Sequence, residues 1–511
     1  MTQQEALAIL DTSKLSLLTG AAGSGKTYTL SRYIQHARAQ GKTVAVTATT
    51  GLAATHLHGT TIHAWSGIGV HETINDSYIA NFSKQRIDTI RKTDLLIIDE
   101  ISMLHDFRLD LVDTVCKSVR KSEQPFGGIR VILCGDFFQL PPVNRHGAKQ
   151  GSFVTNSAAW ETYDFAICYL HEQHRQKEDA SYAEILNGIR KGFLTQRQID
   201  AIKARQTVEF APTITATRLL TNNADVDEIN KLYLEKLQTP SQQYTMLKAG
   251  AKKYVAQLQQ SCLAPEILEL KVGAHVMCIK NSQEKKYVNG SLGIVESFDN
   301  TTNYPVVLLN SGKRVHIQPD SWELIDGDKK RASITQLPLR LAWAITVHKS
   351  QGMTLDAAHI DLRRAFVEGM GYVALSRVKQ LDSLVLDGIN RMALLVSEQA
   401  KTIDSSLQER SEQATNDYAA AIEKWKKNPP IVKKSNTVIT TKTKTSWSDK
   451  LAKMRQEYPN AFTPWSLEDD KILVAQFSNG KSIAWLSKKL GRHEGSIKAR
   501  LEKHLGDDIF A

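Results

Sequence analysis

The stretch Gly20-Ala21-Ala22-Gly23-Ser24-Gly25-Lys26-Thr27 decides the fold of this chain. An apolar run from Leu15 to Thr19 precedes it, and apolar residues at helical spacing follow it at Leu30, Ile34 and Ala37. A strand, a glycine-rich loop and a helix in this order are typical of a phosphate-binding loop with the pattern G-x-x-x-x-G-K-[ST]. Glycines let backbone N–H groups turn around an anion, and the start of the helix adds partial positive charge. The stretch therefore predicts an α/β nucleotide-binding domain.

The same loop indicates how ATP and Mg²⁺ would be held. Lys26 can reach the β- and γ-phosphates, and the Thr27 hydroxyl can join the Mg²⁺ shell. A second apolar run ends in two carboxylates, of which Asp99 is placed to hold Mg²⁺ and Glu100 to activate the attacking water as a general base. The expected nucleotide contacts are Gly20, Ala21, Ala22, Gly23, Ser24, Gly25, Lys26, Thr27 and Tyr28.

The adenine has a candidate partner just ahead of the loop. A glutamine amide offers one acceptor and two donors, which matches the N6/N7 edge of adenine. Gln3 is the candidate and Gln4 its neighbour, in a short amphipathic turn at the start of the chain. The alternative is that both belong to a solvated helix start.

Composition limits the class of protein. With 511 residues the chain has room for about three or four domains. A net charge of +11 favours a polyanionic partner. The five cysteines are scattered without a C-x-x-C pair, so neither a disulfide framework nor a zinc site is expected. No apolar run reaches the roughly 18 residues of a membrane span. The N-terminus lacks a signal-peptide pattern, and we expect a cytoplasmic protein without a membrane partner.

Candidate nucleic-acid contacts follow the strand predicted at Val44 to Thr47. Ligands collect beyond the carboxyl ends of parallel strands, and the segment there is rich in Thr, Gly, His and Trp. Hydroxyls can contact backbone phosphates and an aromatic ring can stack on a base, although an ordinary loop with a core tryptophan is the alternative. The candidates are Thr49, Thr50, Gly51, His63 and Trp65, and the polar residues 66–90 predict a small insertion.

Another buried strand is predicted at Val131 to Gly135, and it breaks into a loop fixed by Pro141 and Pro142. Gln139 lies in that loop, where a neutral amide could sense the γ-phosphate. From here the sequence resembles a known family. The stretch from Pro125 to Val143 is similar to the signature of the Pif-one helicases, superfamily-one DNA helicases that move 5′ to 3′ on single strands.

Further motifs of that family follow in the same order. His171 to Gln176 resembles its E-x-x-R-Q motif, Thr346 to Thr354 its H-K-x-Q-G-x-T motif, and Gly371 to Arg377 its Y-V-A-L-S-R motif. The match covers nearly all of residues 1–390. The resemblance implies two RecA-like motor domains with ATP between them and a DNA strand across their top.

The resemblance also implies roles for single residues. Arg175 and Arg377 would neutralise the γ-phosphate from the two sides of the cleft, as a guanidinium supplied from outside the loop can do. Gln351 and Gly352 would face the nucleotide, and Gln3 fits the glutamine that reads adenine. The candidates for DNA phosphates are His348, Lys349 and Ser350, for which a solvated loop is the alternative.

A strand-rich insertion is predicted from about 245 to 335. Its short strands include 274–279, 292–295 and 306–309, and the turn Asn289-Gly290 favours a hairpin between the first two. The resemblance implies a small SH3-like subdomain that folds over the single strand, with Asn289 as a candidate contact. A purely structural insertion is the alternative.

The C-terminal part has a different character. Residues 396–423 predict polar helices, and Lys424 to Arg455 is rich in lysine with Asp449 as its single acid, which predicts a flexible basic linker. Three helices follow, the first capped by Ser466 and the second ended by Gly491. They resemble a helix-turn-helix domain of the Myb/SANT type, whose third helix would place Lys498 and Arg500 on a duplex groove or, alternatively, bind a protein.

We therefore predict four parts: a first RecA-like domain (1–186), a second RecA-like domain with the β-rich insertion (187–395), a helical then basic linker (396–460) and a helix-turn-helix domain (461–511). The expected function is that of an ATP-dependent 5′-to-3′ DNA helicase of replication, repair or recombination. We expect a monomer that acts on single-stranded and forked duplex DNA, with single-stranded-DNA-binding protein as a candidate partner. The alternatives are a RecD-like subunit of a recombination nuclease complex and a non-catalytic nucleic-acid-binding module.

Overall fold

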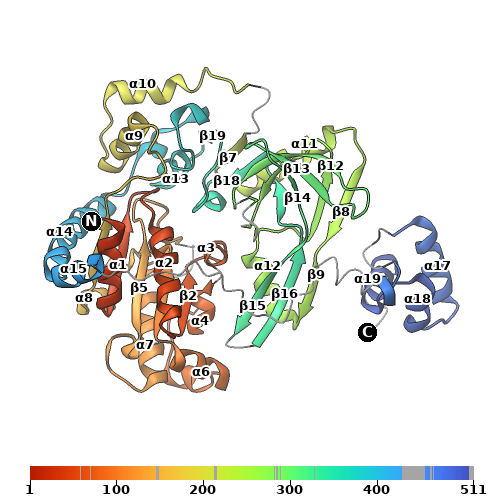
Figure 1. Cartoon of the computed structure of the whole chain (residues 1–511), viewed down its shortest axis with the longest axis horizontal. Helices are drawn as coiled ribbons and strands as arrows, with labels where there is room; N and C mark the ends of the chain where they lie inside the picture. Colours follow the sequence, from red (N-terminus) through yellow and green to blue (C-terminus); the bar gives the residue numbers. More distant parts are fainter. Residues whose placement is uncertain are drawn as a thin grey trace. The chain divides into compact units, whose positions relative to one another are not determined.

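The computed structural model of the chain describes residues 1–57, 59–69, 71–144, 149–211, 216–280, 282, 286–287, 289–326, 329–427, 455–460, 463 and 465–505 (Figure 1). The chain divides into two compact units, Met1–Ile431 and Val432–Ala511. Among the described residues no helix is both long and apolar enough to cross a bilayer.

The first part of the larger unit is built on a six-stranded parallel sheet, which confirms the predicted α/β class. Its strands β1 and β4 are buried along their whole length, as expected for a parallel sheet covered on both faces. In the order β3-β2-β4-β5-β1-β6, the strands are Thr60–Thr61, Val44–Ala48, Leu95–Asp99, Arg130–Gly135, Leu15–Gly20 and Ala166–Leu170. The phosphate-binding loop and the two carboxylates thus leave the same edge of this sheet.

Helices cover both faces of this sheet. Residues that alternate along a strand pack into two different cores, one on each face of the sheet. Leu18 and Ile97 pack with α1 and α2, whereas Leu17 and Ile98 pack with α7. The predicted insertion at 66–90 contains α5 and α6. The helices are α1 Gln3–Thr12, α2 Lys26–Ala39, α3 Gly51–His56, α4 Ile62–Ser66, α5 Asp76–Ala80, α6 Lys84–Lys92, α7 Asp106–Arg120 and α8 Ala158–Thr162.

A second parallel sheet of four strands lies later in the chain, in the order β18-β7-β19-β20. Its strands are Ala344–Thr346, Thr217–Leu220, Ala358–Leu362 and Leu384–Ile389. The helices that accompany it are α9 Ala180–Lys191, α10 Gln196–Ala204, α11 Asn223–Lys236 and α13 Met370–Leu375. Two parallel sheets in one unit agree with the two motor domains that the family resemblance implies.

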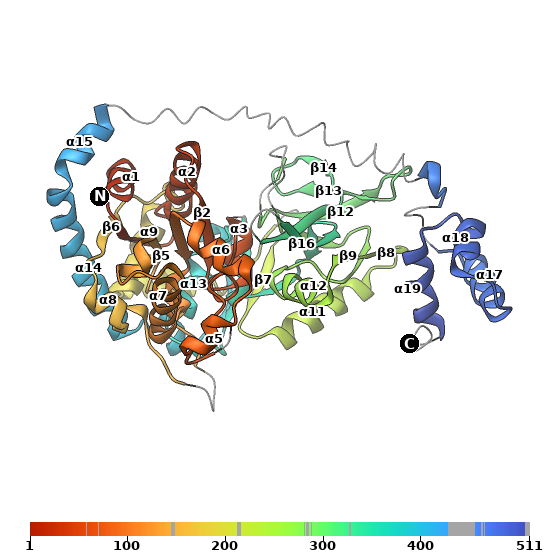
Figure 2. The same cartoon turned by 90° about the horizontal axis from the view of Figure 1, so that it is seen from below.

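Antiparallel strands form the insertion between β7 and β18 (Figure 2). The predicted hairpin is confirmed, because β11 (His275–Cys278) pairs antiparallel with β12 (Leu292–Phe298). The other strands are β8 Ser241–Thr245, β9 Leu247–Gly250, β10 Ile267–Lys271, β13 Pro305–Leu309, β14 Arg314–His316, β15 Asp320–Asp326, β16 Lys329–Gln336 and β17 Leu339–Leu341. The helix α12 (Lys252–Ser261) lies where only strands were expected, because Val255 and Leu258, one turn apart, are buried.

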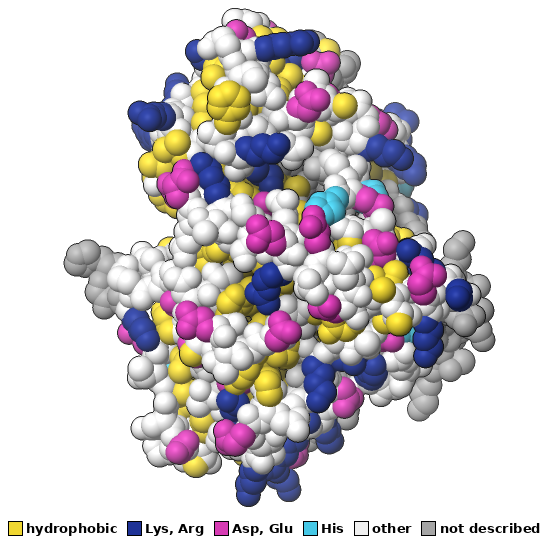
Figure 3. All heavy atoms as spheres, turned by 90° about the vertical axis from the view of Figure 1, so that its left-hand side faces the viewer, with side chains coloured by type: hydrophobic (Ala, Val, Ile, Leu, Met, Phe, Trp, Pro, Cys, Tyr) yellow, Lys and Arg dark blue, Asp and Glu magenta, His cyan; other side chains and the backbone are white. Residues whose placement is uncertain are grey.

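The predicted polar helices after residue 395 are present as α14 (Glu398–Asp417) and α15 (Ala419–Lys427). They pack on the first sheet and do not form a free linker: Ala414 and Ile422 are buried in the same core as α1 and α2. Figures 1 and 2 both show α15 beside α1. The exposed face in Figure 3 mixes basic and acidic side chains, so the net positive charge is not gathered on it.

The smaller unit contains the helices α17 (Leu467–Ser478), α18 (Ile483–Leu490) and α19 (Glu494–Leu505). The expected cap is confirmed, because Ser466 and Asp469 form a reciprocal capping box. Gly491 ends α18 with a φ of 60°. The core contains Leu473, Leu486, Leu490, Ile497 and Leu501. Most of the predicted basic linker, residues 428–454, lies outside the described residues.

Candidate functional site

The phosphate-binding loop is wrapped by side chains from other segments. Gly23 and Gly25 have φ values of 90° and 88°, the left-handed region that favours glycine. A side chain at Gly23 would collide with Gln173 and Arg175, and one at Gly25 would collide with Gln3. The Lys26 ammonium donates to the carbonyls of Gly20 (2.8 Å) and Ala21 (3.0 Å). The loop therefore holds a cation at its centre, within a shell of polar residues.

Whether a polar ligand fits beside the loop can be judged from the buried polar atoms that surround the loop. Ser24 Oγ and the amide oxygens of Gln139, Gln173 and Gln176 have no hydrogen-bond partner among the described residues. Gln173 and Gln176 both border Gly23, and the Gln139 amide contacts Asp136. Because buried polar atoms normally have partners, several such atoms around one loop fit a polar ligand such as a nucleotide with its waters.

Glu100 stands directly after β4 in an unusual backbone conformation. Its φ of 52° and ψ of 47° are left-handed, which is uncommon for a residue other than glycine and is frequent at functional sites. Three contacts hold it there: Gln351 Nε2 donates to Glu100 Oε2 (3.0 Å), Thr49 Oγ1 donates to the Glu100 carbonyl (2.9 Å), and the Glu100 N–H donates to Asp99 Oδ1 (2.9 Å).

The electrostatics of the two carboxylates suit a general base. Burial raises the pKa of Glu100 to about 7, and the negative charge of Asp99 adds to the rise. Burial also raises the pKa of Asp99. A general base is most effective when its pKa lies near the working pH. Glu100 therefore has the location and the proton affinity for that role, and Asp99 lies beside it where a metal ion could be held.

Two arginines meet opposite these carboxylates. Arg377 is buried, and it donates to the carbonyls of Val373 (2.7 Å), Ser350 (3.3 Å) and Met353 (3.3 Å) and to Ser376 Oγ (2.7 Å). Arg175 donates to the Ser376 carbonyl at 2.7 Å. Burial lowers the pKa of Arg175 to about 9, and the charge of Arg377 adds to the fall. Adjacent cations held mainly by neutral groups, one of them fully buried, favour an anion.

These groups come from both parallel sheets. Arg175 follows β6 of the first sheet, whereas Gln351 and Arg377 belong to segments of the second. Direct contacts join the two sides: Gln351 to Glu100, Arg175 to Ser376, and Gln176 Nε2 to the Val378 carbonyl at 2.9 Å. The predicted loop, carboxylates and arginines therefore lie together at a seam between the sheets.

The expected adenine end of the site is at the first turn of α1. Gln3 Nε2 lies 2.9 Å from His174 Nε2, and the Gln3 amide borders Gly25, whereas Gln4 is exposed. Thr27 and Tyr28 are exposed in the first turn of α2, where Arg32 lies over the Tyr28 ring. Gly352, the residue after Gln351, has a φ of 77°. Because the Gln3 amide borders Gly25, Gln3 lies beside the phosphate-binding loop.

The candidate DNA contacts of the first sheet are partly engaged within the protein. Thr50 Oγ1 accepts from the Ala53 N–H at the start of α3, where Gly51 is the first residue. Burial lowers the pKa of His63 to about 4, and Arg108 adds to the fall, so this ring is neutral at pH 7. For Trp65 the structure corrects the expectation of an exposed ring: the side chain is 8% exposed and packs in the main core. Little of its indole is therefore exposed to a base.

The candidate DNA contacts in the second half of the larger unit differ in their exposure and in their contacts within the protein. His348 stacks on the exposed ring of Phe366, with centroids 6.2 Å apart and an interplanar angle of 18°. Burial lowers the pKa of Lys349, and the nearby charge of Arg340 adds to the fall. Ser350 is a correction, because it is fully buried and its hydroxyl donates to the Val347 carbonyl. Asn289 is half-buried, next to Gly290 with its φ of 91°.

In the smaller unit, Lys498 is exposed on α19, as expected for a contact with DNA. Arg500 is a correction. Its guanidinium makes two hydrogen bonds to Asp470 (2.7 and 2.6 Å) and lies over the Trp465 ring. Arg500 therefore joins α19 to α17 and is not held ready for a partner.

A buried arginine behind the seam was not predicted from the sequence. Arg190 is 6% exposed and pairs with Asp136 at 2.7 Å. One signal could have found it: Tyr182, Leu186 and Arg190 stand four residues apart on one face of α9, so a charged residue continues an apolar stripe. Asp136 itself lies in a loop that the sequence singled out.

Comparisons with known proteins agree with this geometry. Residues 4–210 match the family model of the PIF1-like helicases, and residues 253–298 match that of the 2B domain of DNA helicase Pif1. An ATP-dependent DNA helicase Pif1 from a Psychrobacter species is 41% identical over 474 residues, covering 81% of this chain and 72% of that protein.

A human relative, the ATP-dependent DNA helicase PIF1, is 37% identical over 376 residues; the match covers 72% of this chain and 58% of that protein. Among solved structures, a Pif1 helicase from Bacteroides in complex with ADP-AlF3 and single-stranded DNA matches with a TM-score of 0.58 and 31% identity, covering 81% of this chain and 98% of that one.

Proposed function

Since the chain belongs to the PIF1-like helicase family, we propose that it is an ATP-dependent DNA helicase that moves along single-stranded DNA and separates duplex or forked DNA. The observation that carries this function is the seam. Glu100 beside the first sheet contacts Gln351 from the second, and Arg175, which follows the first sheet, contacts the Ser376 carbonyl of the second. Chemistry at such a seam changes the contacts that join two domains, which is what a motor requires.

The site fits Mg²⁺ and the phosphates of ATP. Lys26 and the N–H groups of its loop bind the phosphates, while the Thr27 hydroxyl and the Asp99 carboxylate are oxygen donors of the kind that Mg²⁺ prefers. Bound Mg²⁺ neutralises charge on the phosphate oxygens. Glu100 accepts the proton of the attacking water, and Gln351 orients its carboxylate.

The arginines stabilise the charge that develops on the γ-phosphate. Arg175 and Arg377 donate to the γ-oxygens from the two sides of the seam, and the Gln139 amide lies where it can report whether that phosphate is present. When the phosphate leaves, Arg377 of the second sheet loses its attraction to the nucleotide that the first sheet holds. The seam then loosens, and alternate closing and loosening moves two domains along a strand.

The pKa of Glu100 gives a pH prediction. Below about pH 7 the carboxylate is increasingly protonated and cannot accept a proton from water, so kcat/KM for ATP should fall. At pH 6 about one tenth of the base remains, which predicts a fall of about tenfold relative to the plateau. Phosphate release measured with saturating single-stranded DNA from pH 5.5 to 8.5 checks this, and a flat profile contradicts the role of Glu100.

The proposed direction, 5′ to 3′, rests on the family resemblance. Strand separation by the purified chain should occur on a duplex with a 5′ single-stranded tail and not on the matching duplex with a 3′ tail. The Lys26→Ala variant, which lacks the phosphate-binding ammonium, should separate neither. Equal rates on both tails would contradict the direction, and unwinding by Lys26→Ala would contradict the site.

The basic segment after α15 should strengthen DNA binding. The cut belongs after Lys427, because Trp425 and Lys426 contact His36 and Glu5. Removing residues 428–511 should weaken DNA binding, most strongly at low salt, because fewer counterions are released from the phosphates. DNA-stimulated ATP hydrolysis at saturating DNA should be unchanged. The affinity for DNA, measured from 50 to 300 mM salt, checks this prediction. The control is a full-length protein in which lysines 433, 434, 442 and 444 become Gln. If removing residues 428–511 leaves the affinity unchanged across the salt series, the prediction is contradicted.

The proposed partners follow from the proposed activity. We assign the chain to a monomeric enzyme that works in the cytoplasm with the DNA of the nucleoid, where single-stranded-DNA-binding protein covers the same strands. The three helices of the smaller unit are a helix-turn-helix module in this proposal, and exposed Lys498 is its candidate contact with duplex DNA.

A further inference from the structure

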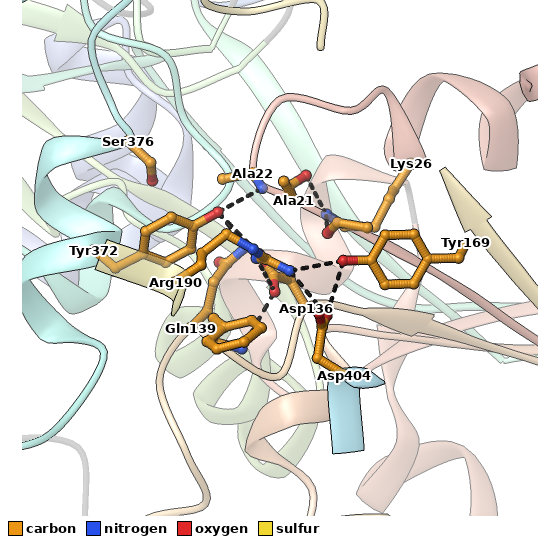
Figure 4. Close-up of polar contacts among 12 residues, drawn as sticks. Ala21, Ala22, Lys26, Asp136, Gln139, Tyr169, Arg190, Tyr372, Ser376 and Asp404 are labelled. Atoms are coloured by element: carbon orange, nitrogen blue, oxygen red, sulfur yellow. Dashed lines mark hydrogen bonds and ion pairs between the residues drawn. The ribbon is translucent and has the colours of Figure 1, made fainter. Parts of the chain in front are cut away.

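A buried group of polar side chains lies directly behind the nucleotide seam, centred on Arg190 (Figure 4). One nitrogen of the guanidinium, NH1, donates to Asp136 Oδ1 (2.7 Å) and to the Tyr372 hydroxyl (3.1 Å). The other, NH2, donates to Asp404 Oδ1 and to the Tyr169 hydroxyl, both at 3.1 Å. Arg190 also lies over the ring of Phe138, 4.1 Å from its centroid. Both terminal nitrogens of this cation and one of its faces are therefore engaged.

One end of the group contacts the phosphate-binding loop. The Tyr372 hydroxyl accepts a hydrogen bond from the Ala22 backbone N–H at 2.9 Å, and Figure 4 shows its ring reaching toward that residue. Tyr372 lies on α13, five residues before Arg377. The hydroxyl thus joins the loop that binds phosphate to the short helix that leads into one of the two arginines.

The other end contacts α14, a helix that follows the last strand of the second sheet in the chain. Asp404 accepts from the Tyr169 hydroxyl at 2.8 Å as well as from Arg190. Tyr169 is in β6, the strand that leads into Arg175, and its N–H donates to Ser411 Oγ of α14 (3.2 Å). The segment that carries the first arginine is therefore also fixed by α14.

The positive charge of Arg190 is permanent at working pH. Burial would lower the pKa of Arg190, but the negative charges of Asp136 and its other neighbours outweigh burial, and the pKa rises well above its ordinary value. Burial raises the pKa of Tyr372, so the phenol keeps the proton that it directs toward Asp136 Oδ2 (3.4 Å). The cation at the centre of this group therefore does not act as a pH switch.

We propose that Tyr372 and Asp404 are positioning residues for ATP hydrolysis, which set the distance between the phosphate-binding loop and the two arginines without touching the nucleotide. This inference rests on the proposed function. Tyr372 fixes α13, and hence Arg377, against Ala22. Asp404 fixes Arg190 and Tyr169, and hence the segment before Arg175. A displacement of about 1 Å at a reacting centre can reduce a rate by about 10²-fold, so a small relaxation of this connection is enough to matter.

Two variants test this role in the full-length protein. Tyr372→Phe removes only the hydroxyl, and Asp404→Asn removes one charge while Arg190 keeps its pair with Asp136. Each should lower kcat of single-stranded-DNA-stimulated ATP hydrolysis by about tenfold and leave KM for ATP within about twofold. The matched control is Asp417→Asn, the same change at an exposed position of α14, which should leave both constants unchanged.

Folded sites are counted in each preparation by the binding stoichiometry of a fluorescent ADP analogue, so that kcat is expressed per site and partial unfolding is not mistaken for slow chemistry. The double variant should lose little more than either single one, because both act through the same connection. A kcat per site within about twofold of the original protein in Asp404→Asn, or an equal loss in Asp417→Asn, overturns the inference. A full-length protein that hydrolyses no ATP with single-stranded DNA overturns the proposed function itself, and this is a different result.

Discussion

Replacing Glu100 by Gln should reduce single-stranded-DNA-stimulated ATP hydrolysis by about 10³-fold while ATP binding is retained. The amide has nearly the shape of the carboxylate and can keep its contact with Gln351, but it cannot accept the proton of the attacking water. Steady-state phosphate release gives the rate, and titration with a fluorescent ATP analogue gives the affinity. The matched control is Glu161→Gln, an exposed glutamate on α8, which should hydrolyse ATP normally. Retention of more than a tenth of the activity in Glu100→Gln contradicts the role of general base.

The same substitution should stabilise the folded protein at high pH. Because burial raises the pKa of Glu100 to about 7 from its usual value, the folded state is favoured while this carboxyl keeps its proton, and stability is lost as pH rises toward 7 and the charge forms. A neutral amide avoids that loss. The free energy of unfolding of Glu100→Gln should therefore exceed that of the original protein by up to about 3 kcal/mol at pH 8 and by little at pH 5. Urea unfolding at both pH values measures the difference, and an equal or lower stability at pH 8 contradicts this account of the pKa.

Replacing Arg175 by Ala should lower kcat for ATP hydrolysis by about 10³-fold, because a guanidinium that meets the γ-phosphate from outside the loop carries much of the charge stabilisation in phosphoryl transfer. The substitution also removes a hydrogen bond to the Ser376 carbonyl, one of the contacts that join the two sheets. ATP should still bind through the loop and Lys26, so KM should change much less than kcat.

Arg197→Ala is the control for this variant, because Arg197 is an exposed arginine on α10, outside the seam. Its kcat and KM should match those of the original protein. A kcat for Arg175→Ala within about tenfold of the control would place this guanidinium outside the transition state. In that event its contact with Ser376 would serve only to join the domains.

Features set by neighbouring residues could be predicted from the sequence. The phosphate-binding loop needs only its glycines, lysine and threonine in one local order, and it stands between a strand and a helix as expected. Three other local predictions are also met. Glu100 follows its strand, the turn Asn289-Gly290 lies between two paired strands, and Ser466 caps its helix. Each of these signals lies in residues that are close together in the chain, so it can be recognised without knowledge of distant contacts.

Features set by distant residues could not be predicted in this way. Whether Trp65 and Ser350 face solvent depends on what packs over them, and both are buried. Arg500 looks like a free cation in the sequence, but Asp470, thirty residues earlier, holds it. Arg190 meets Asp136 and Asp404 across separations of 54 and 214 residues, and no local pattern records such a meeting.

The most direct test is a crystal structure of this chain with ADP, aluminium fluoride, Mg²⁺ and single-stranded DNA, read for the distances from the two guanidiniums to the fluoride. We predict that Arg175 and Arg377 both donate to the fluoride from opposite sides of the seam, at about 3 Å, with a water held between it and Glu100. Guanidiniums that remain on the carbonyls of Ser376 and Val373 and do not reach the fluoride would contradict a nucleotide site shared between the two sheets.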